Sequence, residues 1–150
     1  MNEFKLTNIG NLITYNSDSG KMSSTQDIEI IISGQNIVEI GSSLPNTDDV
    51  FDCKNKLVTP GFVDCHTHPI FFKGRENEFQ LRTQGLTYEE IAKKGGGINS
   101  SVIGVRNASK NELIRKTIPR MDNFLKYGTT TIEAKSGYGL ELDSEIKSLK

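Results

Sequence analysis

Hydrophobic positions follow two different periods along the chain, and the change comes near Pro60. Before it, apolar runs are short, rich in β-branched residues and partly alternating with polar ones, which is typical of strands. Asp27–Ile32 and Ile37–Gly41 are separated by small and polar residues and predict a β-hairpin. Residues 1–59 have too little alternating apolar surface for a robust core, so we expect an all-β region that packs against another part of the protein.

Other segments of this first region give weaker signals. Residues 6–13 predict an opening strand followed by a turn, and the polar residues 17–26 predict a loop. Val50–Cys53 and Leu57–Val58 predict a second pair of short strands that reverses around residues 54–56.

In the second region the apolar spacing becomes that of helices. Thr87 and Glu90 match a capping box and predict a short helix over residues 88–94. Ser109 and Glu112 repeat this signature at the start of a longer helix. The apolar face of that longer helix has spacings of four, three and four residues and consists of Ile114, Ile118, Met121 and Leu125.

The remaining pattern predicts alternation of strands and helices. Pro119 lies inside the longer helix and should kink it or split it in two. Residues 129–135 have strand propensity, and residues 142–150 begin another helical pattern. This order predicts an α/β fold with a parallel sheet. Because a parallel sheet buried on both faces needs more than two strands, we expect the series to continue beyond Lys150.

The only two histidines of the chain, His66 and His68, follow an apolar run that begins at Phe62. A Pro-Gly pair before this run and Pro69 after it predict a short buried strand. Side chains two positions apart on a strand share a face, so both imidazoles should point the same way. Two converging imidazoles can supply two nitrogen ligands to a metal ion such as zinc.

A bare His-x-His pattern is a weak motif, and it has a simpler interpretation. One histidine could be a hydrogen-bonded core residue and the other a loop residue before proline. The bounding prolines and the nearby Asp64 favour the metal site. A catalytic zinc typically takes three protein ligands. Because the chain has no third histidine, the remaining ligands must be carboxylates, Cys65 or residues outside this chain. Cys65 faces away by strand alternation, and Asp64 is either a hydrogen-bonding partner of the site or a structural carboxylate.

The composition narrows the class of protein. At 150 residues the chain fits one ordinary domain, whereas a complete (β/α)8 barrel needs about 250 residues. The net charge of −1 leaves no basic surface for nucleic acid or for an anionic membrane. No apolar run approaches the roughly 20 residues of a membrane span, and the start lacks a secretory pattern. We therefore expect a soluble cytoplasmic protein in which Cys53 and Cys65 stay reduced.

Two segments that follow strands carry candidate binding residues. Arg75 lies in a charged segment after the histidine strand and could donate two hydrogen bonds to a substrate carboxylate. Alternatively, it is a solvated arginine paired with Glu76 or Glu78. Tyr138 lies between two glycines after the strand at 129–135, so it could hydrogen-bond a polar ligand or be the half-buried tyrosine of an ordinary turn.

Taken together, these motifs point to a family. Two motifs are typical of a whole superfamily, Ile37–Gly41 and Val58–His68. Four more are specific to one family within it: Gly74–Phe79, Gly95–Ile98, Tyr127–Thr131 and Lys135–Leu140. With them the chain resembles the imidazolonepropionases, a family of the metal-dependent amidohydrolase superfamily. The resemblance extends from about Ile28 to Lys150 without a large gap.

The resemblance implies a fold and an activity. The fold is the start of a (β/α)8 amidohydrolase barrel in residues 60–150, with an N-terminal portion of a small β-sandwich domain in residues 1–59. The activity is hydrolysis of the ring amide of 4-imidazolone-5-propanoate to N-formimidoyl-L-glutamate, a step of histidine degradation that uses a metal-activated water. The expected partner is this small molecule, with neither nucleic acid nor membrane, and a homodimer is left open.

Matching positions also imply roles for four residues. His66 and His68 match metal ligands for one Zn²⁺ or Fe³⁺ ion per subunit, while Arg75 and Tyr138 match substrate contacts. The family's third histidine ligand and its metal-binding aspartate would follow Lys150, so the chain holds no further catalytic residue. We therefore expect residues 1–150 alone to be inactive.

Two alternatives remain open from the sequence. One is another cyclic-amide hydrolase, or a deaminase, on the same scaffold. The other is a non-catalytic metal-binding or oligomerisation module in which both histidines are structural. The segment Lys135–Leu140 argues against the module, which has no need of it.

Overall fold

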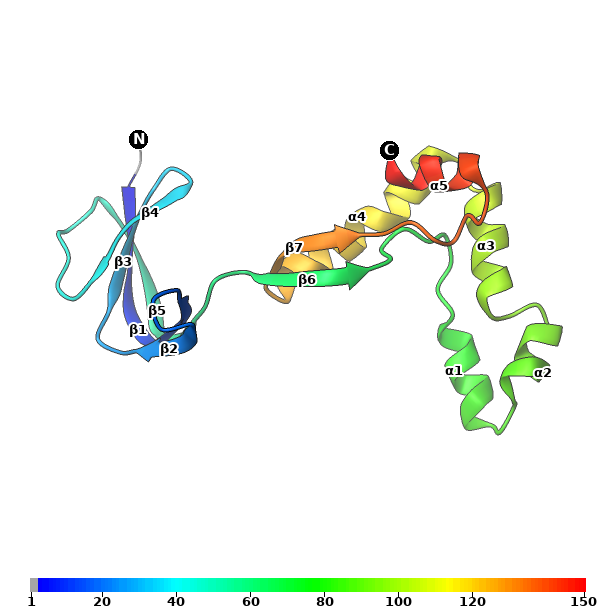
Figure 1. The fold of residues 1–150 in the computed structure, drawn as a ribbon, viewed down its shortest axis with the longest axis horizontal. Coiled ribbons are helices and arrows are strands. Elements are labelled where there is room, and N and C mark those ends of the chain that lie inside the picture. Colours follow the sequence, from blue (N-terminus) through cyan, green and yellow to red (C-terminus); the bar gives the residue numbers. More distant parts are fainter. Residues whose placement is uncertain (1–2) are drawn as a thin grey trace. The chain divides into compact units, whose positions relative to one another are not determined.

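A computed structural model describes residues 3–150. The chain divides into two compact units, Met1–Pro60 and Gly61–Lys150 (Figure 1). In the described residues the first unit contains only strands, and the second contains two strands and five helices. The elements therefore change from all-β to mixed α/β close to Pro60, where the hydrophobic period also changes.

The first unit is a five-stranded sheet built on one long strand, β1. Its strands are β1 (Glu3–Asn16), β2 (Lys21–Thr25), β3 (Glu29–Ser33), β4 (Asn36–Gly41) and β5 (Asp49–Val58). The order is β2-β1-β3-β4, and β5 also pairs with β1. β1 runs antiparallel to β2 and β3 and parallel to β5. A small core of Ile9, Leu12, Ile30 and Cys53 lies within this unit.

The predicted hairpin and the all-β character of this unit are confirmed, since β3 and β4 pair antiparallel. The loop predicted over residues 17–26 is wrong, because β2 occupies Lys21–Thr25. This strand pairs only with β1, so it can form through its backbone without an apolar face of its own. The turn predicted within residues 6–13 is also wrong, because β1 continues as a strand to Asn16.

The second predicted strand pair is wrong as well, because residues 49–58 form the single strand β5. Lys54 and Asn55 take left-handed conformations, with φ of 53° and 56°. The register of β5 against β1 shifts in the same region, so these residues form a bulge and the chain does not reverse.

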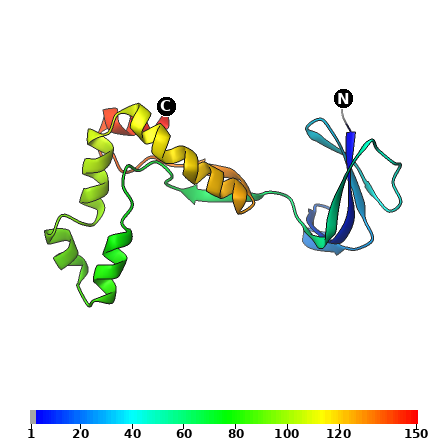
Figure 2. The ribbon, with the colours of Figure 1, turned by 180° about the vertical axis from the view of Figure 1, so that it is seen from behind.

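The second unit alternates strands and helices. Its elements are β6 (Phe62–Thr67), α1 (Glu76–Thr83), α2 (Tyr88–Lys93), α3 (Ile98–Asn107), α4 (Lys110–Lys126), β7 (Thr129–Ala134) and α5 (Leu142–Leu149). β6 and β7 pair in parallel, as predicted from the alternation. Seen from behind, α4 lies along one face of the two strands (Figure 2).

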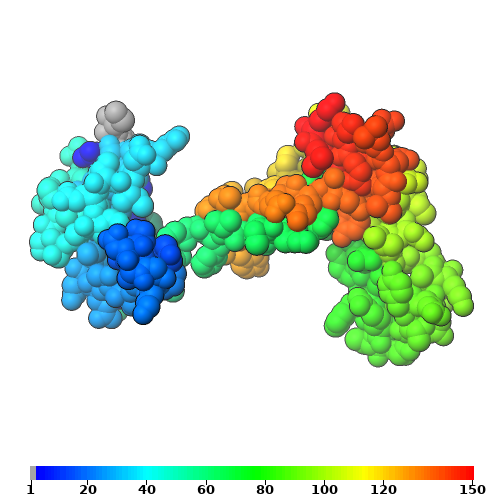
Figure 3. Space-filling view, in the orientation of Figure 1, coloured from blue at the N-terminus to red at the C-terminus, as the bar shows by residue number. Residues whose placement is uncertain are grey.

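The opposite face of β6 and β7 carries no covering layer within this unit (Figure 3). Phe62 is 56% exposed and Val63 is 70% exposed. The prediction that Phe62 begins a buried strand is therefore wrong for this unit, because every residue from Phe62 to His66 is exposed.

The helices begin largely where the sequence predicts. Both capping boxes form, and the backbone and hydroxyl groups of Ser109 donate hydrogen bonds that lower the pKa of Glu112. Pro119 does not divide its helix, since α4 is continuous from Lys110 to Lys126. α1 and α3 were not predicted: α1 buries no residue, and α3 begins at a glycine without a side-chain cap.

The core of this unit joins α3 to α4. Val105, Ala108 and Leu113 are buried together, and Ile70, Phe72 and Tyr138 pack against them. Tyr138 thus rests on the same core that holds the two helices together. No helix within residues 3–150 has the length and apolarity to cross a membrane.

Leu113→Ala should lower the free energy of unfolding of the protein by about 2–5 kcal/mol, because it leaves a cavity in this core. Leu113 is only 3% exposed. Urea unfolding measures the change. Arg115→Ala, at an exposed position of the same helix, is the control and should change the free energy by less than about 0.5 kcal/mol. Equal effects of the two substitutions would contradict the assigned core.

Candidate active site

The two histidines lie at the end of β6, where the strand leaves the sheet. Their ring centroids are 5.6 Å apart and the ring planes are inclined by 53°. His66 is exposed and His68 is half-buried. The Asp64 carboxylate accepts a hydrogen bond of 3.1 Å from the backbone N–H of His66. Asp64 therefore holds the strand end rather than a histidine ring.

His68 is the more constrained of the two rings. Its Nδ1 atom is buried and has no hydrogen-bond partner within the described residues. A Cβ placed on Gly137 would lie 3.1 Å from this atom, so the backbone of the loop after β7 passes directly over the ring. Gly137 also has a φ of 142°, which side-chain-bearing residues rarely adopt. Both observations explain why a glycine occupies this position.

Aromatic rings extend the cluster from His68. The ring of Tyr138 is 5.7 Å from that of His68, and the ring of Phe71 is 6.3 Å from that of Tyr138. Tyr138 is half-buried, as one interpretation of its turn predicted. It nevertheless lies against a histidine that has an unpaired ring nitrogen, so its environment differs from that of an ordinary turn.

Arg120 of α4 fixes the segment that follows His68. Its Nη1 donates hydrogen bonds to the carbonyl oxygens of Pro69 and Phe71, at 3.1 and 2.8 Å. The guanidinium also lies 3.4 Å from the centroid of the Phe71 ring. Sequence reasoning missed Arg120, because an arginine beside a proline in an amphipathic helix gives no sign of which carbonyl groups it will meet.

Arg75 and Tyr138 line one cavity of about 280 Å³, together with Phe71 and Ser101. Arg75 immediately precedes α1, and its side chain is 40% exposed. It makes one long ion pair, 4.0 Å from Glu78, which agrees in part with the solvated alternative. Because an ion pair of this length at a surface contributes little, the guanidinium remains available to a ligand.

Glu78 links the helix that follows Arg75 to the start of α3. The carboxylate of Glu78 accepts a hydrogen bond of 2.7 Å from the backbone N–H of Gly97, which begins α3. This contact joins α1 to α3, the two helices that the sequence does not predict. Arg75 is therefore carried by a segment that is anchored at Gly97.

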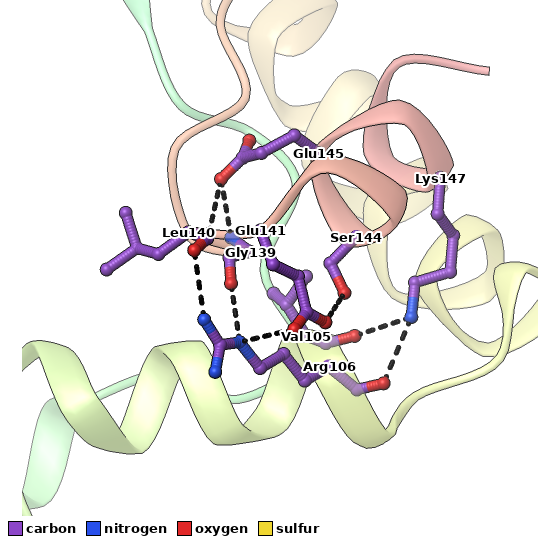
Figure 4. Close-up of polar contacts among 8 residues, drawn as sticks. All are labelled: Val105, Arg106, Gly139, Leu140, Glu141, Ser144, Glu145 and Lys147. Atoms are coloured by element: carbon purple, nitrogen blue, oxygen red, sulfur yellow. Dashed lines mark hydrogen bonds and ion pairs between the residues drawn. The ribbon is translucent and has the colours of Figure 1, made fainter.

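The loop of residues 136–140, which carries Tyr138, is held by two charged side chains (Figure 4). Glu145 of α5 accepts hydrogen bonds from the backbone N–H groups of Gly139 and Leu140, at 2.8 and 2.7 Å. Arg106 of α3 donates hydrogen bonds to the carbonyl oxygens of the same two residues, at 2.7 and 3.0 Å. The backbone N–H and C=O groups of both residues are therefore satisfied, the former by Glu145 and the latter by Arg106.

The Glu145 carboxylate is ionised in this setting. Burial acts to raise its pKa, but hydrogen bonding to Ser136, Leu140, Gly139 and Gly137 outweighs burial, so the pKa lies below the usual value. Ser136 and Gly137 lower this pKa without forming hydrogen bonds of ordinary geometry, because the Oε2 atom of Glu145 has no hydrogen-bond partner within the described residues. The ionised carboxylate therefore stabilises the folded protein. This stabilisation is fully present when the pH is above the usual pKa of a glutamate, and it is lost as the pH falls through the lowered pKa of Glu145.

The two histidines fit a metal ion only in part. Side-by-side imidazoles with one buried, unpaired ring nitrogen suit two ligands. Within residues 3–150, no group of three or more His, Cys, Asp or Glu side chains converges on one point. Cys65 is a free, exposed thiol, and Cys53 is a free, buried one, as expected for reduced cysteines. Any further ligands must come from outside the described residues.

Comparison of the sequence with known proteins shows which family it is most similar to among those considered above. No family model matches the sequence. The chain is 45% identical over 144 residues to the imidazolonepropionase of Brucella abortus, which covers 93% of this chain and 36% of that protein. It is 59% identical over 99 residues to the imidazolonepropionase of Brucella anthropi, covering 66% of this chain and 24% of that protein.

The chain is a relative of the imidazolonepropionases. This confirms the resemblance drawn from the short motifs. The chain spans about a third of the length of the curated imidazolonepropionases that it matches.

Solved structures agree on the fold. An amidohydrolase superposes with a TM-score of 0.55 at 19% identity, over 92% of this chain and 27% of that one. Guanine deaminase from C. acetobutylicum superposes with a TM-score of 0.53 at 24% identity, over 97% of this chain and 32% of that one. The chain is thus α/β with a β-rich first unit, similar in fold to amidohydrolases.

Arg120→Met should lower the free energy of unfolding by about 1–3 kcal/mol, because it leaves the carbonyl groups of Pro69 and Phe71 without their donor. Arg115→Met, on the exposed side of the same helix, is the matched control. Urea unfolding of both variants of the complete protein measures the difference. If the two variants unfold alike, Arg120 does not hold the segment after His68.

Proposed function

We propose that the complete protein containing this chain is an imidazolonepropionase. It would hydrolyse the ring amide of 4-imidazolone-5-propanoate to N-formimidoyl-L-glutamate. The observation that carries the proposal is the match to imidazolonepropionases over 93% of the chain. The placement of Arg75 and Tyr138 on one cavity, with the ring of Tyr138 5.7 Å from that of His68, supports it.

In this proposal His66 and His68 hold one metal ion, Zn²⁺ or Fe³⁺. The support is the closeness of their rings, whose centroids are 5.6 Å apart, and the unpaired Nδ1 of His68. Such an ion supplies Lewis acidity, which lowers the pKa of water and polarises a carbonyl group. The remaining ligands belong to parts of the protein that follow this chain, and the 150 residues alone should therefore be inactive.

The substrate has two features that the described residues suit. Its propanoate carboxylate suits the guanidinium of Arg75, which can donate two parallel hydrogen bonds to a planar anion. Its polar ring suits the hydroxyl of Tyr138, which can donate and accept. Because both residues line a cavity of about 280 Å³, one small molecule could contact both at once.

The same proposal assigns the two units their places in the larger fold. Residues 1–59 would form part of a small β-sandwich domain, and residues 60–150 the first β/α units of a (β/α)8 barrel. The parallel pair β6 and β7 with α4 between them in sequence supports the barrel assignment. We expect the complete enzyme in the cytoplasm, and its mass in solution will show whether it is a homodimer.

The complete protein should open the ring of 4-imidazolone-5-propanoate and should act at least about a hundredfold more slowly on hydantoin, dihydroorotate and guanine, which lack the propanoate that Arg75 binds. Ultraviolet absorbance of the imidazolone ring follows the reaction. Purified residues 1–150 are the control and should show no turnover. Preference for guanine or for another cyclic amide would favour the deaminase or the alternative hydrolase over this proposal.

His68→Ala and His66→Ala in the complete protein should each release the metal ion and lower kcat by more than about a hundredfold, because each removes one ligand. Metal analysis by mass spectrometry gives the content, and added Zn²⁺ should not restore it. Cys65→Ala, at the exposed position directly before His66, is the control and should keep its metal. Full metal content in both histidine variants would contradict the assignment of these ligands.

A further inference from the structure

We propose that Glu145 and Arg106 are positioning residues that act through Tyr138, by fixing the loop of residues 136–140 against His68. This inference deepens the proposed function and rests on it for its kinetic test. Neither side chain lines the cavity with Arg75 and Tyr138. Their effect must therefore pass through the loop backbone.

The first step of the argument is that two consecutive residues of the loop have both their backbone N–H and their C=O groups held by charged side chains. The N–H groups of Gly139 and Leu140 donate to one oxygen of Glu145, and their carbonyl groups accept from Arg106. A turn of this length normally leaves most of these groups to water. Four charge-assisted hydrogen bonds, each stronger than a neutral one, instead fix the orientation of the residues directly after Tyr138.

The second step is that α3 and α5 are themselves fixed to each other. The ammonium group of Lys147 on α5 donates to the carbonyl oxygens of Val105, Arg106 and Ala108, at 2.8, 3.2 and 2.7 Å. These carbonyl groups end α3, where a positive charge is favoured. Glu145 and Arg106 thus act from two helices that cannot move apart freely.

The third step is that the loop backbone closely approaches other segments on both sides of Tyr138. A Cβ on Gly139 would lie 2.7 Å from Cβ of Ser144, so the loop backbone lies directly on the start of α5. A Cβ on Gly137 would lie 3.0 Å from Cε1 of His68. Tyr138 lies between these two close approaches, so a shift at Gly139 is passed to the tyrosine and to the surroundings of His68.

The sharpest substitution is Glu145→Gln, which keeps the size of the side chain. One oxygen can still accept from Gly139 and Leu140. The accepting oxygen, however, is no longer charged, and the new amide N–H group takes the place of Oε2, which is buried without a hydrogen-bond partner within the described residues. Because the bonds to the loop lose their charge assistance and a buried donor is left unpaired, the loop should shift.

The matching substitution on α3 is Arg106→Lys, which keeps the positive charge. A lysine cannot hold both carbonyl groups in the geometry of a guanidinium fork. The controls are Glu112→Gln, whose carboxylate accepts two similar hydrogen bonds from Ser109 at an exposed helix start, and Arg115→Lys. Neither control residue touches the loop.

In the complete enzyme, Glu145→Gln and Arg106→Lys should each lower kcat/KM for 4-imidazolone-5-propanoate by about tenfold, because a displaced contact residue weakens transition-state binding. In a Tyr138→Phe background the same substitutions should cost less than about twofold, since the group they position is gone. The two controls should keep kcat/KM in both backgrounds. Effects that multiply fully in the Tyr138→Phe background would overturn the proposal.

A measurement that needs no activity keeps this role separate from the proposed function. In the complete protein labelled with 3-fluorotyrosine, the signal of Tyr138 is identified by its loss in Tyr138→Phe. Glu145→Gln and Arg106→Lys should shift or broaden this signal, because it depends on the nearby rings of His68 and Phe71. An unchanged signal in both variants overturns the positioning role, while a shifted signal without ring opening in the unaltered protein rejects the imidazolonepropionase function alone.

Discussion

The close approach of the Gly137 backbone to the ring of His68 is the constraint on which the arrangement of the site depends. β6 and β7 run in parallel, so their last residues lie at the same end of the sheet. The segment after β6 carries His68, and the segment after β7 carries Gly137 and Tyr138. A Cβ at residue 137 would press on the His68 ring at 3.0–3.1 Å and would be strained by the φ of 142°.

Two sets of polar contacts maintain this approach from different elements. Arg120 on α4 holds the carbonyl groups after His68, and Glu145 with Arg106 holds the peptide groups after Tyr138. In each case a charged side chain from a helix satisfies backbone groups of a loop. A loop without regular structure thereby gains a single conformation, which a binding site requires.

The sequence predicts the elements that have a strong local signal. Thr87 and Ser109 form capping boxes, and the hairpin of β3 and β4 has β-branched residues around a turn, so local energetics alone decide these elements. β5 was misread because the bulge at Lys54 depends on its pairing with β1, which is distant in sequence. α1 and α3 were missed because neither has a side-chain cap.

The residues of the candidate site likewise fall into those that the sequence predicts and those that it does not. The spacing of His66 and His68 on a strand predicts that their rings lie side by side, and short motifs single out Arg75 and Tyr138. Arg120 and Glu145 could not be found, because their role follows from which backbone groups they meet 49 to 51 and 5 to 6 positions away. Long-range hydrogen bonds to peptide groups leave no residue pattern.

The uncovered face of β6 and β7 has a consequence for how the protein is made. While only residues 1–150 have left a ribosome, Phe62 and Val63 face water. Apolar strand faces and open edges invite pairing with other nascent chains. Production of the protein in a cell therefore depends on how soon these strands are shielded, by another part of the protein or by a chaperone.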